Sequence, residues 1–358
     1  LAAIADEDVA PRVDDPRLQM WFLGNETGMF DHPGHDNDGV RDFRRWIWTL
    51  CPEASTIDAP QCAPHALAGF LRARYSTLGA LNSAWESAYP GEDFATIVDV
   101  GPRPVPYEHD CNLTCREDLQ RFVHDELLRR WVELVTTTVR ATDPGHLLAS
   151  PRMALVGAPA YRFWEGASSA TPEAWYDEPG VSVPTDAADV TYCPFDLLAR
   201  KGDAGFDLVA VNVYDGDPQF EEPWLGDGFR KLHERSGLPI VVSEFSIRAR
   251  IDGWSNRGGA GAFVPDDDAT DDQIQRGAYY RSQIEQFAAH PFVLGASWHA
   301  WSDRYDASDP AHQIDMGLLQ CDDPARGFEA GQRWDELDDR IADTNCGILE
   351  RIEQLTGS

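Results

Sequence analysis

The chain has 358 residues, and its 61 acidic side chains against 30 basic ones give a formal net charge of −31. A charge this negative argues against nucleic acid, a membrane surface or a polyanionic substrate as the main partner. With 42% hydrophobic and 11% aromatic residues, the chain is not a disordered acidic segment. No stretch approaches the roughly 18 apolar residues that a membrane-spanning helix needs.

Lysine is nearly absent, since Lys201 and Lys231 are the only two. Concentrated salt shortens the range of charge repulsion to a few ångströms, so an acidic surface costs little stability there. The composition therefore predicts a salt-adapted, halophilic protein. An ordinary acidic protein is the alternative.

Five short apolar stretches are predicted to be strands, namely residues 19–23, 146–150, 206–213, 238–243 and 292–297. The stretch FDLVAVNV at 206–213 is almost continuously apolar, as expected for a strand covered on both faces. Amphipathic stretches between and after the strands predict helices at 66–75, 77–85, 117–141, 270–289 and 334–355. Strands alternating with helices indicate parallel strands joined by helical crossovers.

Polar and aromatic residues collect at or shortly after the C-terminal ends of the predicted strands: Asn25, Glu26, Arg152, Asn212, Tyr214, Glu244, Trp298, Trp301 and Asp303. In a (β/α)8 TIM barrel this edge carries the active site. A doubly wound sheet also binds ligands at strand ends. However, no glycine-rich phosphate loop follows any strand, so a nucleotide-binding fold is disfavoured.

Glu26 and Glu244 each come directly after a short apolar strand. Hydrolysis of a glycosidic bond with retention needs two carboxyl groups about 5 Å apart, one as acid/base and one as nucleophile. A barrel can bring the ends of two distant strands to that separation. The two glutamates are therefore the candidate catalytic pair, although either could be a surface or helix-capping residue.

Seven stretches carry a resemblance to a known clan: WFLGNE (21–26), FLRARYSTLGALNSAW (70–85), HLLASPRM (146–153), FDLVAVNVY (206–214), LPIVVSEFS (238–246), GAGAFVP (259–265) and GASWHAWSD (295–303). The chain resembles the retaining glycoside hydrolases whose catalytic glutamates lie on barrel strands four and seven. Within that clan it is most similar to the β-galactosidase and β-agarase families. The similarity extends from about residue 16 to residue 320.

The resemblance implies roles for five residues. Glu26 would be the acid/base and Glu244 the nucleophile. Asn25 would bind the sugar 2-hydroxyl, and Tyr214 would orient the nucleophile. Trp298 would form the floor of the sugar site, where an indole covers the C–H face of a pyranose well. The implied reaction needs no cofactor.

Other candidates have competing interpretations. Arg152 could bind substrate or pair with a structural carboxylate, and Asn212 could instead satisfy backbone groups. Trp298 and Trp301 could be core aromatics. Four further tryptophans are expected in loops, where they could stack on sugars or pack a loop core: Trp164, Trp175, Trp224 and Trp254.

No metal site is predicted. His32 and His35 beside two aspartates imitate a metal cluster, but a solvated turn is the preferred interpretation. Seven cysteines without paired CxxC motifs argue against a zinc ribbon. Some galactosidase relatives have a zinc-binding cysteine cluster near Cys51 and Cys62, but two cysteines do not suffice for it. Cys51/Cys62 or Cys111/Cys115 could form disulfides, and buried free thiols are equally compatible.

The chain departs from the clan in length. Glu26 is reached too early for three preceding strands, so the sequence predicts strands four to eight only. Residues 1–358 are then expected to form a single, N-terminally incomplete barrel domain, with 27–116 as a long insertion after strand four. A longer natural chain, a second copy or a partner chain would complete the barrel.

The sequence thus predicts a retaining hydrolase of β-glycosidic bonds in galactose-containing oligo- or polysaccharides. A β-glucosidase, β-mannosidase or β-xylosidase of the same clan is the first alternative. A non-catalytic carbohydrate-binding barrel and a calcium-dependent adhesion module are the others. Localisation stays open, and secretion is slightly favoured because a polysaccharide is degraded outside the cell.

Overall fold

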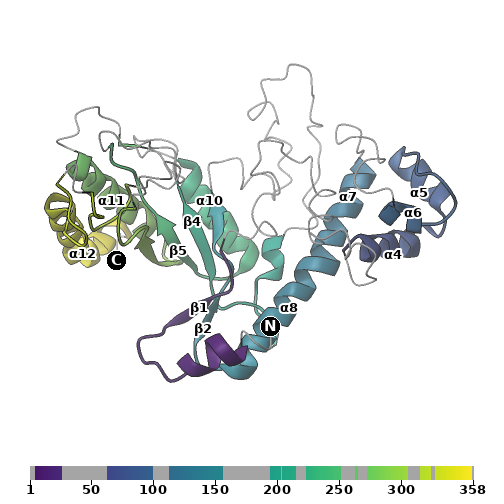
Figure 1. Cartoon of the computed structure of the whole chain (residues 1–358), viewed down its shortest axis with the longest axis horizontal. Coiled ribbons are helices and arrows are strands. Elements are labelled where there is room, and N and C mark those ends of the chain that lie inside the picture. The colour runs from purple at the N-terminus through teal and green to yellow at the C-terminus, as the bar shows by residue number, and fades with distance from the viewer. Residues whose placement is uncertain are drawn as a thin grey trace, which may run out of the picture. The chain divides into compact units, whose positions relative to one another are not determined.

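A computed structural model describes residues 5–25, 63–99, 113–155, 194–202, 204–214, 223–250, 263–264, 272–304, 315–323 and 327–356 (Figure 1). The chain divides into two compact units. The strand unit comprises Pro16–Thr27, His146–Tyr161 and Phe206–Ser358. The helical unit comprises Leu1–Asp15, Gly28–Gly145 and Arg162–Gly205, so it takes in nearly all of the segment 27–116 that was expected to be an insertion.

The strand unit is built on parallel strands. Strand β1 (Met20–Phe22) pairs with β2 (Leu147–Ala149), and a second sheet has the order β3 (Met153–Leu155), β4 (Val209–Val213), β5 (Ile240–Phe245), β6 (Val293–Trp298). All of these pairs are parallel. Single bridges from Asn25 to Arg152 and from Ala149 to Leu208 connect the two sheets. The strands therefore lie side by side in chain order.

Each of the five predicted strands is present within three residues of its expected start. The second differs, because the chain continues in strand conformation as β3 instead of ending at Pro151 and Arg152. Pro151 separates β2 from β3. Proline has no backbone N–H to donate to a neighbouring strand, so the ladder is interrupted there and resumes after it.

The core of the strand unit lies on both sides of β4, whose five residues are all fully buried. This confirms the expectation that this strand is covered on both faces. Helices α10 (Pro223–Ser236), α11 (Asp272–Ala288) and α12 (Asp335–Thr356) belong to the same unit. The ring of Phe245 on β5 packs against Tyr280 and Phe287 of α11, at centroid distances of 5.6 and 5.2 Å.

Helix α12 packs along α11 (Figure 1). The hydroxyl of Tyr280 donates to Asn345 Oδ1 at 2.8 Å. Gly277 has no room for a side chain, since a Cβ there would lie 2.5 Å from Arg340 Cδ. The predicted helices at 270–289 and 334–355 are confirmed by these two elements. Trp224, expected in a loop, lies instead in α10, where the helix starts at Pro223.

The helical unit contains α4 (Ala63–Tyr75), α5 (Leu78–Trp85), α6 (Ala95–Asp99), α7 (Leu113–Phe122), the π-helical turn η5 (Val123–Leu128) and α8 (Arg129–Thr142). In the part of this unit that the structure describes, short turns η1 (Ala5–Val9), η2 (Ala10–Arg12) and η7 (Pro194–Leu197) are also present. Thr77 caps α5 by accepting from Ala80 N at 3.2 Å. The helices predicted at 66–75, 77–85 and 117–141 are thus present.

One buried carboxylate ties three helices of this unit together. Asp118 on α7 is fully buried and accepts hydrogen bonds from Trp85 Nε1 at 2.8 Å and from the Tyr75 hydroxyl. Arg74 Nε lies 2.5 Å from its other oxygen. The charge of Asp118 is therefore compensated, as a buried charge requires.

Cys115 in this unit is disulfide-bonded, whereas Cys321 and Cys346 are free thiols. The expected alternatives at Cys51, Cys62 and Cys111 fall on parts of the chain that the structure does not describe. Within the described ranges, no helix combines the length and apolar character that crossing a bilayer requires.

Candidate active site

The ends of four strands bring polar side chains to one place in the strand unit. Asn212 on β4 is the register partner of Glu244 on β5. Asn25, after β1, is bridged to Arg152, which precedes β3. Since parallel strands end at a common edge, these side chains, distant in sequence, meet there. The expected grouping of Asn25, Arg152, Asn212 and Glu244 is thus present in the structure.

An irregularity in β5 aims Glu244. The register between β4 and β5 shifts between Val211 and Asn212, and the register between β5 and β6 shifts between Val242 and Phe245. At the shifted position, the hydroxyl of Ser243 lies within hydrogen-bond distance of two acceptors, Val211 O at 3.0 Å and Asn212 Oδ1 at 2.8 Å. Such bulges re-aim a side chain and occur often beside active sites.

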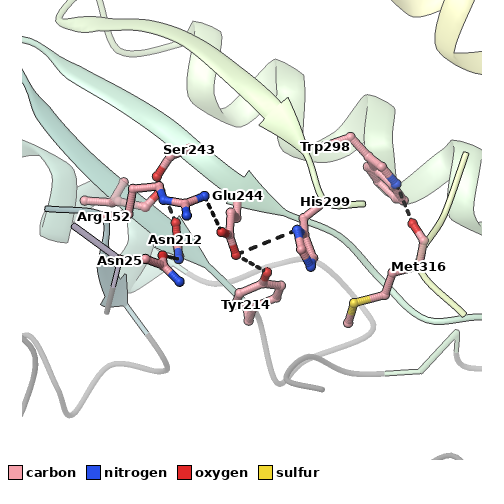
Figure 2. A network of polar contacts seen from close by, with 10 residues as sticks. Asn25, Arg152, Asn212, Tyr214, Ser243, Glu244, Trp298, His299 and Met316 are labelled. Atoms are coloured by element: carbon pink, nitrogen blue, oxygen red, sulfur yellow. Dashed lines mark hydrogen bonds and ion pairs between the residues drawn. The ribbon is translucent and has the colours of Figure 1, made fainter. Parts of the chain in front are cut away.

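Three side chains converge on the Glu244 carboxylate (Figure 2). Arg152 Nη1 donates to Oε1 at 2.6 Å, and the Tyr214 hydroxyl donates to Oε2 at 2.6 Å. His299 Nδ1 lies 3.9 Å from Oε2. The Glu244 side chain is only 9% exposed. Both of its oxygens are thus held by donors, and the Arg152 guanidinium compensates the charge of this nearly buried carboxylate.

Asn212 and Asn25 form a second polar link beside this carboxylate. Asn212 Nδ2 donates to Asn25 Oδ1 at 3.1 Å, and Asn212 Oδ1 accepts from Ser243. Asn212 is fully buried, whereas Asn25 is exposed. Asn212 therefore forms hydrogen bonds with neighbouring side chains in the interior, whereas solvent reaches Asn25.

Trp298 is not where the resemblance implies it. It is the register partner of Phe245, and its ring packs against Phe245, Tyr279 and Tyr280 at centroid distances of 5.4, 6.5 and 5.8 Å. The indole N–H donates to Met316 O at 2.7 Å, away from Glu244 (Figure 2). Successive side chains of a strand point to opposite faces. Trp298 and Phe245 thus face α11, and Glu244 faces the other side.

The ring on the Glu244 side of β6 belongs to His299, which the sequence analysis did not single out. His299 follows Trp298 directly, and its backbone N–H donates to Phe245 O at 3.0 Å. Its imidazole meets Tyr214 edge-on, with centroids 6.4 Å apart. The signal in the sequence is strand alternation, because a tryptophan opposite the buried Phe245 leaves the next residue on the Glu244 face.

Asp303, which was expected to bind substrate, is engaged in hydrogen bonds within the fold, and its contact with substrate stays a prediction. It is 5% exposed, and its two oxygens accept from Gly317 N at 2.6 Å and from Trp334 Nε1 at 2.8 Å. Burial raises the pKa of Asp303 to about 6, against a lowering effect of the nearby Arg276. Asp303 therefore fixes the segment that follows β6, and its side chain is nearly buried there.

Further buried charges lie behind this segment. Arg276 on α11 is fully buried, donates to Gly317 O at 2.9 Å and lies over the Trp298 ring at 5.5 Å. Arg248 Nε pairs with Asp315 Oδ1 at 3.1 Å, and burial raises the pKa of Asp315. Trp301, by contrast, is 72% exposed, so it is not a core aromatic within the part of the chain described. Its contact with substrate stays a prediction.

Several predicted residues lie outside the described ranges. These are Glu26, His32, His35, Trp164, Trp175, Trp254 and the aspartates beside the two histidines. The separation of the two candidate catalytic carboxyl groups therefore stays a prediction. Where residues are described, no group of three or more histidine, cysteine, aspartate or glutamate side chains is arranged to hold a metal ion.

Comparison with known proteins gives consistent findings. The sequence profile of the beta-galactosidase family matches residues 2–165. Beta-galactosidase BbgII of Bifidobacterium bifidum is 23% identical over 229 residues, which are 63% of this chain and 26% of that protein. An exo-beta-agarase structure is 19% identical, with 92% of this chain and 35% of that chain covered and a TM-score of 0.58. A beta-galactosidase structure from the psychrophilic Marinomonas ef1 is 14% identical, with 99% and 44% covered and a TM-score of 0.50.

The profile match and the galactosidase relative are similarities to glycoside hydrolases, and the structural likenesses support an α/β fold of the TIM-barrel type. The chain spans between about a quarter and less than half of the length of these relatives. At these identities the structural likeness concerns the fold. The reaction mechanism and the sugar that the protein acts on are therefore proposed from the geometry of the site.

Proposed function

We propose that the protein is a retaining β-glycosidase in which Glu244 is the nucleophile and Glu26 the acid/base. One observation carries the proposal: a nearly buried carboxylate at the end of a barrel-type strand, with each oxygen held by one donor. A nucleophile has to be correctly positioned, and a guanidinium and a phenol at 2.6 Å hold the two carboxylate oxygens in place. Glu26 follows Asn25 directly in the chain, and Asn25 is linked to Asn212 beside Glu244.

The proposed reaction has two steps. Glu244 attacks the anomeric carbon and forms a glycosyl ester, while Glu26 gives its proton to the leaving oxygen. A water molecule then gives a proton to Glu26 and attacks the same carbon, which releases the sugar and restores the Glu244 carboxylate. In the first step Arg152 and Tyr214 hold the attacking carboxylate in place. Asn25, which is exposed, is positioned to meet the sugar 2-hydroxyl.

The proposed substrates are β-linked, galactose-containing oligo- or polysaccharides. Support comes from the beta-galactosidase profile and from the named galactosidase and agarase relatives. Because those similarities are remote, aryl β-galactosides should be assayed beside the matching glucosides, mannosides and xylosides. The sugar with the highest kcat/KM identifies the substrate class.

The test of the mechanism is Glu244→Gln in the full chain, with aryl β-galactoside and agaro-oligosaccharide as substrates. We expect turnover to fall by roughly 10⁴-fold or more, because the ester intermediate no longer forms. A 2-deoxy-2-fluoro aryl galactoside should label Glu244, and mass spectrometry of the peptide identifies the labelled residue. Glu234→Gln is the control, since Glu234 is an exposed residue of α10 that pairs with Arg230. Wild-type rates in Glu244→Gln would refute the proposal.

We also propose that the parallel strands are one part of a barrel. Large apolar side chains are exposed at the outer strands, with Phe22 of β1 at 42% and Leu294 of β6 at 64%. Open edges of a sheet invite pairing with further strands. Another stretch of the protein, a second copy or a partner chain would supply them. Amide hydrogen exchange tests this, because slow exchange along β1 and β6 is expected if they are paired in solution.

A further inference from the structure

The two consecutive rings at the end of β6 lie on opposite faces of the strand (Figure 2). The Trp298 indole is half-buried against Phe245 and the tyrosines of α11. The His299 imidazole is on the Glu244 side, and its side chain is 41% exposed. The group that borders the candidate site from β6 is thus polar, where an indole was expected.

The imidazole is held in orientation but keeps an open side. Its backbone N–H is fixed to Phe245 O, and its ring stands at 87° to the Tyr214 ring. Its Nδ1 approaches Glu244 Oε2 only to 3.9 Å, which is longer than a hydrogen bond. Within the described ranges, neither ring nitrogen of His299 has a hydrogen bond. A positioned donor and acceptor therefore lie beside the proposed nucleophile.

We propose that His299 is a specificity-determining residue that hydrogen-bonds a hydroxyl group of the sugar unit bound at Glu244. The inference rests on the proposed glycosidase function. An imidazole can donate from one nitrogen and accept at the other, and a sugar hydroxyl can do both. A site that binds a substrate hydroxyl discriminates strongly against an analogue without it, because its polar group is then left unpaired.

The experiment compares wild type with His299→Ala on an aryl β-galactoside and on its monodeoxy derivatives. We expect kcat/KM for the parent substrate to fall by roughly 30-fold or more in His299→Ala, and added imidazole to restore part of it. For the derivative that lacks the contacted hydroxyl, the two proteins should differ by less than about threefold, because the interaction is already absent. His290→Ala is the control, since His290 packs on Phe292 at the far end of β6.

The outcomes separate the two proposals. If Glu244→Gln is inactive while His299→Ala matches wild type, or loses the same factor on every deoxy derivative, the role of His299 is refuted and the glycosidase stands. If Glu244→Gln keeps full activity, the glycosidase mechanism is refuted. If wild type turns over no aryl glycoside, the mechanism also fails. Titration calorimetry with galactose then decides, because equal binding by wild type and His299→Ala overturns the inference.

Discussion

Arg152 and Glu244 lie 92 residues apart in the chain, yet their side chains form an ion pair of 2.6 Å beside the proposed sugar site. Of the two donors that hold Glu244, Arg152 supplies the positive charge. The side chain of Arg152 is 31% exposed, so solvent reaches it. The ion pair is therefore part of the candidate site as well as of the folded core.

Arg152→Ala should lower kcat by roughly 100-fold with a smaller change in KM, because the nucleophile loses a charge-assisted hydrogen bond and its aim. Arg152→Lys should recover little of this loss, since an ammonium cannot reproduce the guanidinium geometry. Steady-state kinetics on the substrate that wild type prefers would measure both effects. Arg281→Ala on the exposed face of α11 is the control. An unchanged kcat in Arg152→Ala would contradict the role.

Asp303 should make stability depend on pH. Burial raises its pKa to about 6, so the folded chain binds this proton more tightly than the unfolded chain does. This proton therefore contributes to the free energy of unfolding at low pH, and the contribution is lost as pH rises from about 4 to about 6. The loss amounts to about 3 kcal/mol.

Urea unfolding between pH 4 and pH 7 measures this contribution. Asp303→Asn should remove it, so the difference in unfolding free energy between the variant and wild type changes across this window. Asp339→Asn, at an exposed position of α12, should leave that difference constant. A constant difference for Asp303→Asn as well would show that Asp303 does not titrate in this range.

Asp118 should be essential to the helical unit. Asp118→Ala leaves the Trp85 indole N–H and the Tyr75 hydroxyl without their acceptor and Arg74 without its partner. Breaking a buried charge pair of this kind costs about 3–5 kcal/mol. Glu117→Ala, one residue earlier and exposed, should cost less than about 0.5 kcal/mol. Thermal unfolding followed by circular dichroism measures both, and equal melting temperatures would contradict the assignment.

Salt adaptation, which the composition predicts, is open to a direct test. A net charge of −31 repels itself over about 10 Å at 0.1 M salt and over about 3 Å at 1 M. We expect the melting temperature to rise steeply from 0.1 to 1 M KCl as repulsion is screened. Sucrose at matched osmolality is the control for exclusion from the protein surface. A melting temperature that does not change with KCl would count against salt adaptation.

The strands and the gathering of polar residues at their ends were predictable from sequence, because apolar runs and parallel crossovers determine both. The face on which a particular side chain lies was not. Phe245 and Trp298 are register partners, which shows that Trp298 faces α11, and register depends on pairing across strands. The bulge at Ser243 is equally invisible in a pattern of apolar and polar residues.

The two-unit organisation was also beyond the sequence, since a segment that reads as an insertion can build its own core. Leu71, Leu81 and Phe122 of the helical unit are all fully buried. The surroundings of Asp303 could not be predicted for a related reason. Its position after a strand suggested substrate contact, but its partners Gly317 and Trp334 come from later in the chain.

The opposed orientation of Trp298 and His299 makes the site sensitive to the length of β6. Because side chains alternate with a period of two residues, a deletion or insertion of one residue upstream in this strand would exchange the two rings. An indole would then border the nucleophile, and an imidazole would sit in the apolar layer against α11. A change in strand length by a single residue would thus replace the polar group beside Glu244 by an aromatic surface.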